Sequence, residues 1–596
     1  MATAIKRSYA NFKGIDFANE PSLVNLSRSP DALNVWKDYN STQGSCIETR
    51  PGYRKIAKYS NNINGIYMYK EKALVHAGNI LYLWDNFPGE PDELKVLNDN
   101  MNNARSNFII FNDKVYILDG KHYLCFDGET AKEANELDTY IPTTTINRYP
   151  SGGGEMYQDV NCLTPYRKNS FLSDGKSTEY YLDTTSIADV VKVTIDDVET
   201  TDFTVNKAVG MIKFTTPPKE PDQDGADNVV VTFKKNVEGY YNRIANCTII
   251  TVFDNRIFYS GNNDYPNAIF HCALNNPLYV EDLAYYEDGT SESAVKKMVV
   301  GNNVLWVLKE NSQQKDTIFY HTATTDSTGK VYPNYQGNIS LGCYADAINY
   351  KDDVVFLSRN GLEGISSTEI TSRQLLNHRS SLVDNRLINE NNFSLAQMAE
   401  WKGYLVILAG ESLYLADMRQ IFQGINGSEY EWYLWNIASA KPAIIKEYKD
   451  KLYIGSKDGS IFVFEGTNDN GEAINSYWTM PMDNFGYGNM TKTTNKRGGI
   501  AKIKTIPNGM VKVSEITNKD LNGKFIKEYS TTGFDFNNID FSNFTFNTGV
   551  SSYIVYKIKE KKFTELSLKF YSDELDKPFG IYSAILEAFV GGYVKK

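Results

Sequence analysis

The feature that most constrains this fold is a short phrase that the chain repeats seven times. Each copy is an aromatic or apolar residue, a short polar turn and then an alternating apolar strand, and the copies begin at Tyr69, Phe111, Phe253, Val300, Tyr350, Trp401 and Tyr448. Their starts lie 42, 142, 47, 50, 51 and 47 residues apart. A period near 40–50 with several short strands is typical of radially repeated β-sheets, because a repeat that cannot bury its own apolar face must stack on its neighbours.

Only the spacing of 142 departs from this period, and removing about 100 residues restores it. Residues 59–139 and 239–475 then form the repeated part, 318 residues or about 45 for each of seven units. The sequence therefore predicts an all-β protein built on a β-propeller of about seven blades. A strongly diverged extra copy would make eight blades, and one false copy would make six.

The interruption, residues 140–238, is predicted to be a small β-sandwich inserted between blades two and three. It holds alternating segments at Val190–Ile195, Met211–Thr215 and Val229–Lys234, and Ser151–Gly154 suits a flexible junction. It contains no copy of the repeat. We therefore expect that a protein lacking Thr143–Glu238 keeps a folded propeller.

The two ends of the chain do not follow the repeat. Residues 1–58 are predicted to be an irregular arm with one short helical turn over Ala32–Trp36 and a turn at Arg50–Tyr53. Residues 476–596 are predicted to be a C-terminal β-domain, with strands at Ser551–Lys559, Phe563–Phe570 and Ile585–Tyr593 and a loop at Phe534–Phe546.

Composition favours strands and disfavours some partners. The chain has 41 Tyr and 30 Phe but only 18 Pro, a balance that suits strands and polar turns. Its net charge of −11 argues against general attraction to nucleic acid or anionic membranes. Residues 1–58 hold nine Lys/Arg and five Asp/Glu, a balance of +4, which leaves −15 for the remainder.

Cysteine and histidine are scattered along the chain. The six cysteines (Cys46, Cys125, Cys162, Cys247, Cys272 and Cys343) include no Cys-x-x-Cys pair, so neither a zinc site nor a disulfide framework is indicated. The first residues lack the apolar core of a signal peptide, and no apolar run approaches the ~18 residues of a membrane helix. We therefore expect free thiols in a reducing compartment and no membrane segment.

Motifs that carry chemistry in other proteins are incomplete here. The nearest approaches are Ser173-Asp-Gly for a sialidase turn, the pairs Asp196-Asp197 and Asp352-Asp353 for a glycosidase, Asp222 and Asp224 for a calcium loop, and Gly152–Gly154 for a phosphate loop. Each lacks the partners its chemistry needs, and a solvated turn explains each more simply. The sequence predicts no catalytic residue, no cofactor-binding residue and no metal ligand, and hence a protein that is not an enzyme.

Several further sequence phrases occur in a characteristic order. They are Phe12–Asp16 with Ser29–Asn34 and Arg50–Tyr53, then Asp264–Asn267 with Asn276–Tyr279, Ile339–Cys343 with Phe356–Gly361, and Glu431–Trp435 with Leu452–Gly459. In this order they resemble the β-propeller tail proteins of tailed bacteriophages, which form the tube or nozzle below the portal of short-tailed phages and are often called stabilisation or tail-hub proteins. An inserted sandwich and a C-terminal β-domain also fit this family.

The resemblance implies a structural protein of the virion tail, made and assembled in the cytoplasm of the host bacterium. By analogy with the family the chain would form a sixfold homo-oligomeric ring, contact other tail and head–tail connector proteins, and let double-stranded DNA pass without sequence-specific binding. It implies no catalytic residues and no cofactor.

Two other classes of function remain open on the sequence. One is a carbohydrate-binding or carbohydrate-degrading propeller, which would need a funnel lined with Trp, carboxylates or a metal site. The other is a cytoplasmic interaction scaffold of WD-like type, although the Gly-His and Trp-Asp repeat marks are missing. For a ring that conducts DNA we expect acidic or neutral residues at the channel, because a basic wall would hold the phosphates, and the +4 arm away from it.

Overall fold

The computed structural model describes residues 4–41, 44–89, 94–223, 225–327, 329–365, 376–424, 427–495, 498–531 and 551–594. Strands make up most of the ordered structure. The α-helices in these ranges are α1 (Tyr240–Ala245) and α2 (Asp384–Leu387), and the 3-10 turns are η1 (Ala134–Glu136), η2 (Phe393–Leu395) and η3 (Ala438–Ala440). Phe534–Phe546, predicted to be a loop, lies outside the described residues.

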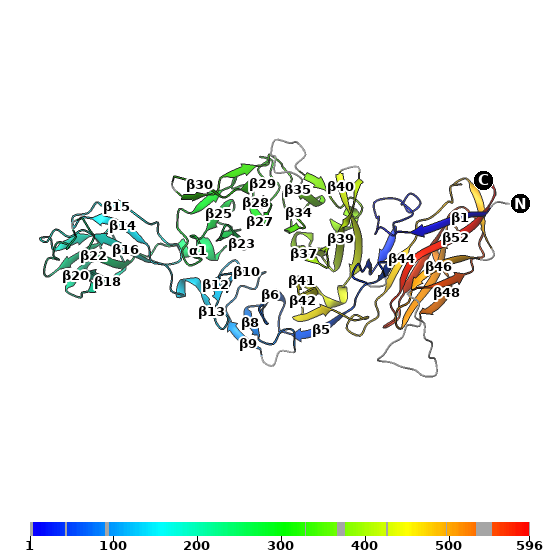
Figure 1. The fold of residues 1–596 in the computed structure, drawn as a ribbon, viewed down its shortest axis with the longest axis horizontal. Helices are drawn as coiled ribbons and strands as arrows, with labels where there is room; N and C mark the ends of the chain where they lie inside the picture. Colours follow the sequence, from blue (N-terminus) through cyan, green and yellow to red (C-terminus); the bar gives the residue numbers. More distant parts are fainter. Residues whose placement is uncertain are drawn as a thin grey trace. The chain divides into compact units, whose positions relative to one another are not determined.

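Seven antiparallel sheets of four strands carry the repeat (Figure 1). The first four are β6 (Ile63–Tyr69), β7 (Lys72–Ala77), β8 (Ile80–Trp84) and β9 (Lys95–Asn98); β10 (Asn107–Phe111), β11 (Lys114–Leu118), β12 (Tyr123–Phe126) and β13 (Ala131–Glu133); β23 (Ile249–Phe253), β24 (Arg256–Ser260), β25 (Ala268–His271) and β26 (Tyr285–Glu287); and β27 (Val295–Gly301), β28 (Val304–Lys309), β29 (Ile318–His321) and β32 (Asn334–Gln336). A separate hairpin, β30 (Thr324–Asp326) with β31 (Gly329–Val331), precedes β32.

The other three sheets complete the series. They are β33 (Ala347–Tyr350), β34 (Asp353–Ser358), β35 (Gly361–Ile365) and β36 (Leu376–His378); β37 (Gln397–Trp401), β38 (Tyr404–Ala409), β39 (Ser412–Gly424) and β40 (Gly427–Asn436); and β41 (Pro442–Tyr448), β42 (Lys451–Ser456), β43 (Ser460–Phe464) and β5 (Tyr53–Lys58). The architecture is a β-propeller, as the period predicted.

The repeated phrase is the hairpin between the first two strands of each sheet. At six of the seven copies both central turn residues have positive φ, for example Asp254 (46°) and Asn255 (56°), or Lys402 (47°) and Gly403 (77°). Two-residue turns of this kind match the right-handed twist of the strands they join. Asn and Asp dominate these positions because they enter the left-handed region at less cost than other side chains.

The predicted equivalence of the strands is confirmed. Val115, Ile257, Val304, Val354, Leu405 and Leu452 each lie on the second strand of their sheet, namely β11, β24, β28, β34, β38 and β42, and all six are buried. First strands of successive sheets pack on one another, as β10 does on β23 and β37 does on β41. This contact buries the apolar faces that one sheet leaves uncovered.

The last sheet takes its outer strand from the beginning of the chain. β5 pairs antiparallel with β43, with Val463 opposite Arg54 and Phe464 opposite Tyr53. The chain then continues into β6, which packs against β41 and β42. Residues 53–58 therefore belong to the propeller and not to an arm.

Four further short strands of residues 1–58 also join sheets, with irregular chain between them, so the prediction that the whole segment is an irregular arm was wrong. β1 (Ala4–Ala10) pairs with β52 (Gly580–Tyr593), β2 (Asp31–Leu33) pairs with β44 (Ser476–Thr479), and β3 (Val35–Lys37) pairs with β4 (Ile47–Thr49), which in turn pairs with β52. The expected helical turn over Ala32–Trp36 is absent from the described chain, because pairing with distant strands satisfies this backbone as extended structure.

The C-terminal segment and these N-terminal strands form one β-sandwich, here called the terminal sandwich. One sheet contains β3, β4, β52, β1, β45 (Met490–Thr494), β46 (Gly499–Lys504), β49 (Ser551–Tyr556) and β50 (Lys561–Phe563). The other has the order β2, β44, β51 (Leu566–Ser572), β47 (Gly509–Thr517) and β48 (Asp520–Thr531). Both ends of the chain therefore lie in one domain (Figure 1).

The insertion is a β-sandwich, as predicted. Its larger sheet has the order β15 (Glu155–Met156), β14 (Thr143–Arg148), β16 (Tyr166–Phe171), β22 (Val229–Lys234), β18 (Asp189–Ile195) and β19 (Val198–Glu199). The smaller one has the order β17 (Glu179–Tyr181), β21 (Met211–Phe214) and β20 (Phe203–Asn206). The sandwich has its own core, which includes Phe171, Tyr180 and Phe233.

One stretch inside the predicted insertion packs with the propeller instead. Cys162 and Leu163 are buried with strands of the second and third sheets. The amide N of Cys162 donates to the carbonyl O of Val280 at 2.8 Å, and the Asn161 side chain donates to the carbonyl O of Leu278 at 2.8 Å. The predicted insertion therefore includes a short segment that belongs to a core of the propeller.

By density of contacts the chain divides into two compact units. One comprises residues 1–71, 85–92 and 344–596, and the other comprises residues 72–84 and 93–343. The first holds the terminal sandwich with the fifth, sixth and seventh sheets. The second holds the inserted sandwich with the second, third and fourth sheets.

The contacts at the ends of the inserted sandwich predict different outcomes for two ways of removing it. The carbonyl O of Thr143 accepts from the amide N of Gln158 at 3.1 Å, and the carbonyl O of Pro165 accepts from the amide N of Lys235 at 2.8 Å. Short glycine linkers can therefore replace residues 144–157 and 166–234 while residues 158–165 remain. We expect this variant to keep the propeller folded, with a cooperative thermal transition in calorimetry and a β-sheet circular dichroism spectrum.

The complete deletion of Thr143–Glu238 is the matched comparison. It also removes the buried Cys162 and Leu163, and emptying such positions typically costs about 3 kcal/mol or more. We therefore expect a lower melting temperature than for the shorter excisions. Equal stability of the two variants would contradict the role given to residues 161–163.

Candidate interaction surface

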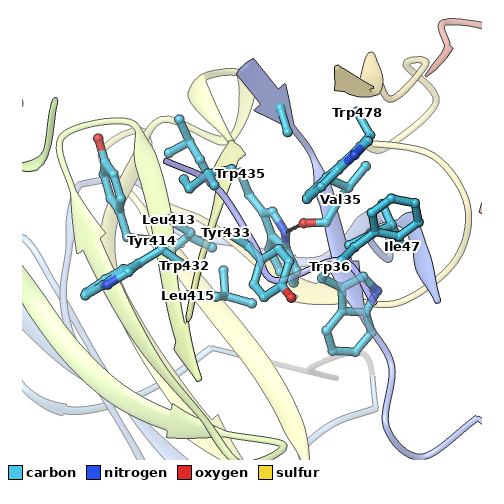
Figure 2. Close-up of a cluster of buried hydrophobic side chains, with 14 of the residues drawn as sticks. Val35, Trp36, Ile47, Leu413, Tyr414, Leu415, Trp432, Tyr433, Trp435 and Trp478 are labelled. Atoms are coloured by element: carbon cyan, nitrogen blue, oxygen red, sulfur yellow. Dashed lines mark hydrogen bonds between the residues drawn. The ribbon is translucent and has the colours of Figure 1, made fainter. Parts of the chain in front are cut away.

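The terminal sandwich is held to the sixth sheet by an aromatic cluster (Figure 2). Trp36 stacks on Trp401 with ring centroids 5.3 Å apart and meets Trp435 edge-on at 5.8 Å. The indole N of Trp435 donates to the carbonyl O of Val35 at 3.1 Å. Buried aromatic pairs add about 0.5–1.5 kcal/mol each beyond their buried area, so this cluster fixes the N-terminal strands against β40.

A fully buried ion pair completes this attachment. The Arg50 guanidinium donates to both carboxylate oxygens of Asp469, at 2.8 and 2.6 Å. It also donates to the side-chain O of Asn34 and the carbonyl O of Asn436. Arg50 thus joins the start of β5, the N-terminal strands and the end of β40 at one point. The Arg-Pro-Gly-Tyr turn was noticed in the sequence, but nothing there indicated the partner Asp469.

One face of the larger sheet in the terminal sandwich is exposed and apolar. Its registers place Val555 of β49 opposite Ile500 of β46, and Ile500 opposite Ile585 of β52. Val555 is 54% exposed and Ile500 is 43% exposed, while Ile554, Ala501 and Ala584 on the alternate positions are buried. The strands therefore present a row of apolar side chains to solvent where alternation normally places polar ones.

Lysines flank this row. Tyr553, 70% exposed, is opposite Lys502, and beyond Val555 the same alternation exposes Lys557. Lys6 of β1, on the far side of β52 from β46, is exposed on the same face and lies opposite Glu587. We call the set of Lys6, Ile500, Lys502, Tyr553, Val555 and Lys557 the basic–apolar face. Sequence analysis predicted the strand at Ser551–Lys559 but not the exposure of its apolar residues.

Charge is divided between the ends and the middle of the chain. Residues 1–58 and 476–596, whose described parts form the terminal sandwich and β5, hold 26 Lys/Arg and 17 Asp/Glu, a balance of +9. Residues 59–475 hold 36 Lys/Arg and 56 Asp/Glu, a balance of −20. The charge of −15 outside residues 1–58 is thus unevenly distributed along the chain, because residues 476–596 have a net positive charge.

The most strongly perturbed histidine is His378 on β36. Its Nδ1 lies 2.9 Å from Glu363 and its Nε2 lies 2.6 Å from Asp384. Burial by itself lowers the pKa of this imidazole, but the hydrogen bonds to the two carboxylates outweigh burial and raise the pKa to about 10. Ser380 donates to Asp384 rather than to the imidazole. With its pKa near 10 the imidazole stays protonated at neutral pH and cannot act there as a general base, so this cluster has the chemistry of a structural clamp rather than of a nucleophilic triad.

Both aspartate pairs that the sequence singled out lie at hairpins of the described structure, and Asp224 lies outside the described residues. Asp196 and Asp197 are the two central residues of the hairpin between β18 and β19, with φ of 48° and 63°. Asp352 occupies the turn between β33 and β34, while Asp353 is in β34 and pairs with Arg379 at 3.0 Å. Neither pair brings two carboxylates to a shared site. All six cysteines are buried, and none of them forms a disulfide in the described structure.

Cavities of the described structure include one in each compact unit. One of about 400 Å³ lies in the first unit and is lined by residues that include Trp36, Glu48, Lys402 and Lys504. The other, of about 440 Å³, lies in the second unit beside Cys162, Arg167 and Tyr241. Within the described ranges, no cluster of three or more His, Cys, Asp or Glu side chains is placed to hold a metal ion, and no helix has the length and apolar character of a membrane span.

No protein-family model and no curated protein matches this chain. Solved structures similar to it include the designed Ika8 protein (11% identity, TM-score 0.30, covering 70% of this chain and 99% of that one) and BamB from Moraxella catarrhalis (11%, 0.28, 70% and 97%). The Pan2 WD40 domain of Neurospora crassa is a third (7%, 0.30, 70% and 94%). With such TM-scores the propeller assignment rests on the sheet order of this chain itself.

Replacing Arg50 tests the anchor of the terminal sandwich. Arg50→Ala leaves the buried Asp469 without its partner, which typically costs about 3–5 kcal/mol, so we expect a clearly lower thermal transition by calorimetry. The control is Arg54→Ala on β5, whose pair with Glu465 is 56% and 46% exposed; a loss of about 0–1 kcal/mol is expected there. Equal losses in the two variants would show that Arg50 is not an anchor.

His378 predicts a pH-dependent contribution to stability. Its pKa is about 10 in the folded protein, against about 6.5 in an unfolded chain. The stabilisation is therefore fully present below about pH 6.5 and is lost as pH rises through about 10. The difference in unfolding free energy between wild type and His378→Gln should shrink over that range.

The control for this measurement is His271→Gln. Burial lowers the pKa of His271 to about 4, so its contribution changes only below about pH 6.5. The wild-type difference for that variant should stay flat between pH 7 and 10. A difference for His378→Gln that does not depend on pH would refute the clamp.

Proposed function

We propose that this protein is a structural component of a bacteriophage tail. It would form an oligomeric ring or tube, sixfold by analogy with the family it resembles, through which double-stranded DNA leaves the particle. Its neighbours would be further tail and head–tail connector proteins. In this role the chain has no catalytic residue and works by its shape, its charge and its contacts with other subunits.

The observation that carries this proposal is that sequence segments on which the family resemblance rests contact one another in the structure. Ile15 of the opening phrase donates its amide N to the carbonyl O of Trp432, in the phrase before the last blade, at 2.9 Å. Gly14 has φ of 79°, and a Cβ there would lie 2.4 Å from the same carbonyl O. Arg50, from a third phrase, bonds the end of β40 at Asn436. Three of the phrases thus share one structural junction, which supports reading them as one inherited feature.

The charge pattern also suits passage of DNA. A protein that neutralises phosphates with Lys or Arg binds DNA more tightly through counterion release, so a channel wall works best when it is acidic or neutral. The acidic residues 59–475 would supply such a wall, while the net positive charge belongs to residues 1–58 and 476–596. The expectation that residues 1–58 lie away from the channel therefore applies to residues 476–596 as well.

Electron microscopy of the purified protein and of phage particles that contain it tests this function. We expect rings or tubes in the purified sample and labelled antibody at the tail of the particle. Discrete monomers that bind glycans on an array, with no label on particles, would overturn the proposal in favour of a carbohydrate-binding propeller.

A further inference from the structure

The basic–apolar face has the composition of a protein-docking surface. Its apolar row crosses β49, β46 and β52 as cross-strand neighbours, and single exposed apolar residues would not be aligned in this way. Aromatic and apolar residues ringed by polar ones are characteristic of interfaces. The lysines at its margin give it a positive sign, in agreement with the +9 of the segments that build it.

We propose that the basic–apolar face of one copy of this chain docks onto the acidic middle segment, residues 59–475, of a second copy. Charge decides between the two kinds of self-contact. An isologous contact would bring two positive faces together, and like charges brought together cost affinity. A contact between the end segments of one copy, which carry +9, and residues 59–475 of another copy, which carry −20, joins opposite charges.

Such a contact is heterologous, and heterologous contacts that close generate rings. The inference therefore rests on the proposed function and deepens it, by assigning the interface and its polarity. Val555, Ile500 and Tyr553 would supply the buried apolar centre of the interface. Lys502, Lys557 and Lys6 would supply its charged margin, where they set specificity and the rate of association more than affinity.

Oligomeric state measured by mass photometry and sedimentation velocity tests this assignment. Val555→Ser and the double variant Lys502→Glu/Lys557→Glu should each reduce the assembled fraction at least about tenfold, as the loss of a central apolar contact or a reversal of charge allows. Raising the salt from about 0.05 M to about 0.5 M should weaken assembly of the wild type, because the Debye length falls.

Matched controls lie on β48 of the other sheet and in the turn that precedes it. Leu521→Ser replaces an apolar residue that is 74% exposed on β48, and Lys519→Glu/Lys527→Glu changes the net charge by the same amount as the test variant. Both controls should assemble as the wild type does. Circular dichroism checks that every variant is folded.

A photo-crosslinking residue at position 555 identifies what the face touches. In a mixture of isotopically light and heavy protein, we expect crosslinks between copies that end in residues 59–475. Crosslinks that end in residues 1–58 or 476–596 of the second copy would overturn the heterologous contact.

Three further outcomes separate this inference from the proposed function. Rings in the wild type that persist in both face variants would contradict the inference but not the proposed function. A wild type that stays monomeric at every concentration would sink both. Binding of the wild type to a DNA duplex that the face variants lose, with assembly unchanged, would assign the face to nucleic acid and overturn self-docking.

Discussion

The fold depends on the fact that a four-stranded sheet leaves apolar faces that only another sheet can cover. Each sheet of the propeller begins with a hairpin whose second strand is buried over all or nearly all of its length, as β38 and β42 are. The last sheet takes β5 from the start of the chain as its outer strand. That requirement brings the N-terminal residues to the region where the C-terminal segment begins, and the two ends then share one sandwich.

The terminal sandwich and the inserted sandwich are attached in different ways. The terminal sandwich shares a core with the fifth, sixth and seventh sheets, and Trp36 and Trp478 belong to the same cluster as residues of β40. Arg50 with Asp469 adds a buried ion pair, which is costly to break even when it adds little net stability. The inserted sandwich has a core of its own, and residues 161–163 link the chain beside it to the propeller.

Charge adds a second level of organisation to the packing. The basic ends and the acidic middle are separated along the sequence, and folding gathers the two basic ends into one domain. The structure therefore concentrates opposite charges on different parts of one chain. In the ring that we propose, this distribution would favour contacts between unlike surfaces and would leave acidic surface for the channel.

The sequence by itself determined the propeller, its hairpins and the inserted sandwich, because these depend on local period, turn residues and alternation. Asn302 and Asn303 specify their turn without help from distant residues. Only the tertiary structure decided the fate of residues 1–58, whose short strands are stable through partners such as β44 and β52, more than 400 residues away. The same holds for the candidate surface: alternation showed that Val555 and Ile554 lie on opposite faces, but burial of Ile554 and exposure of Val555 follow from which face meets the second sheet.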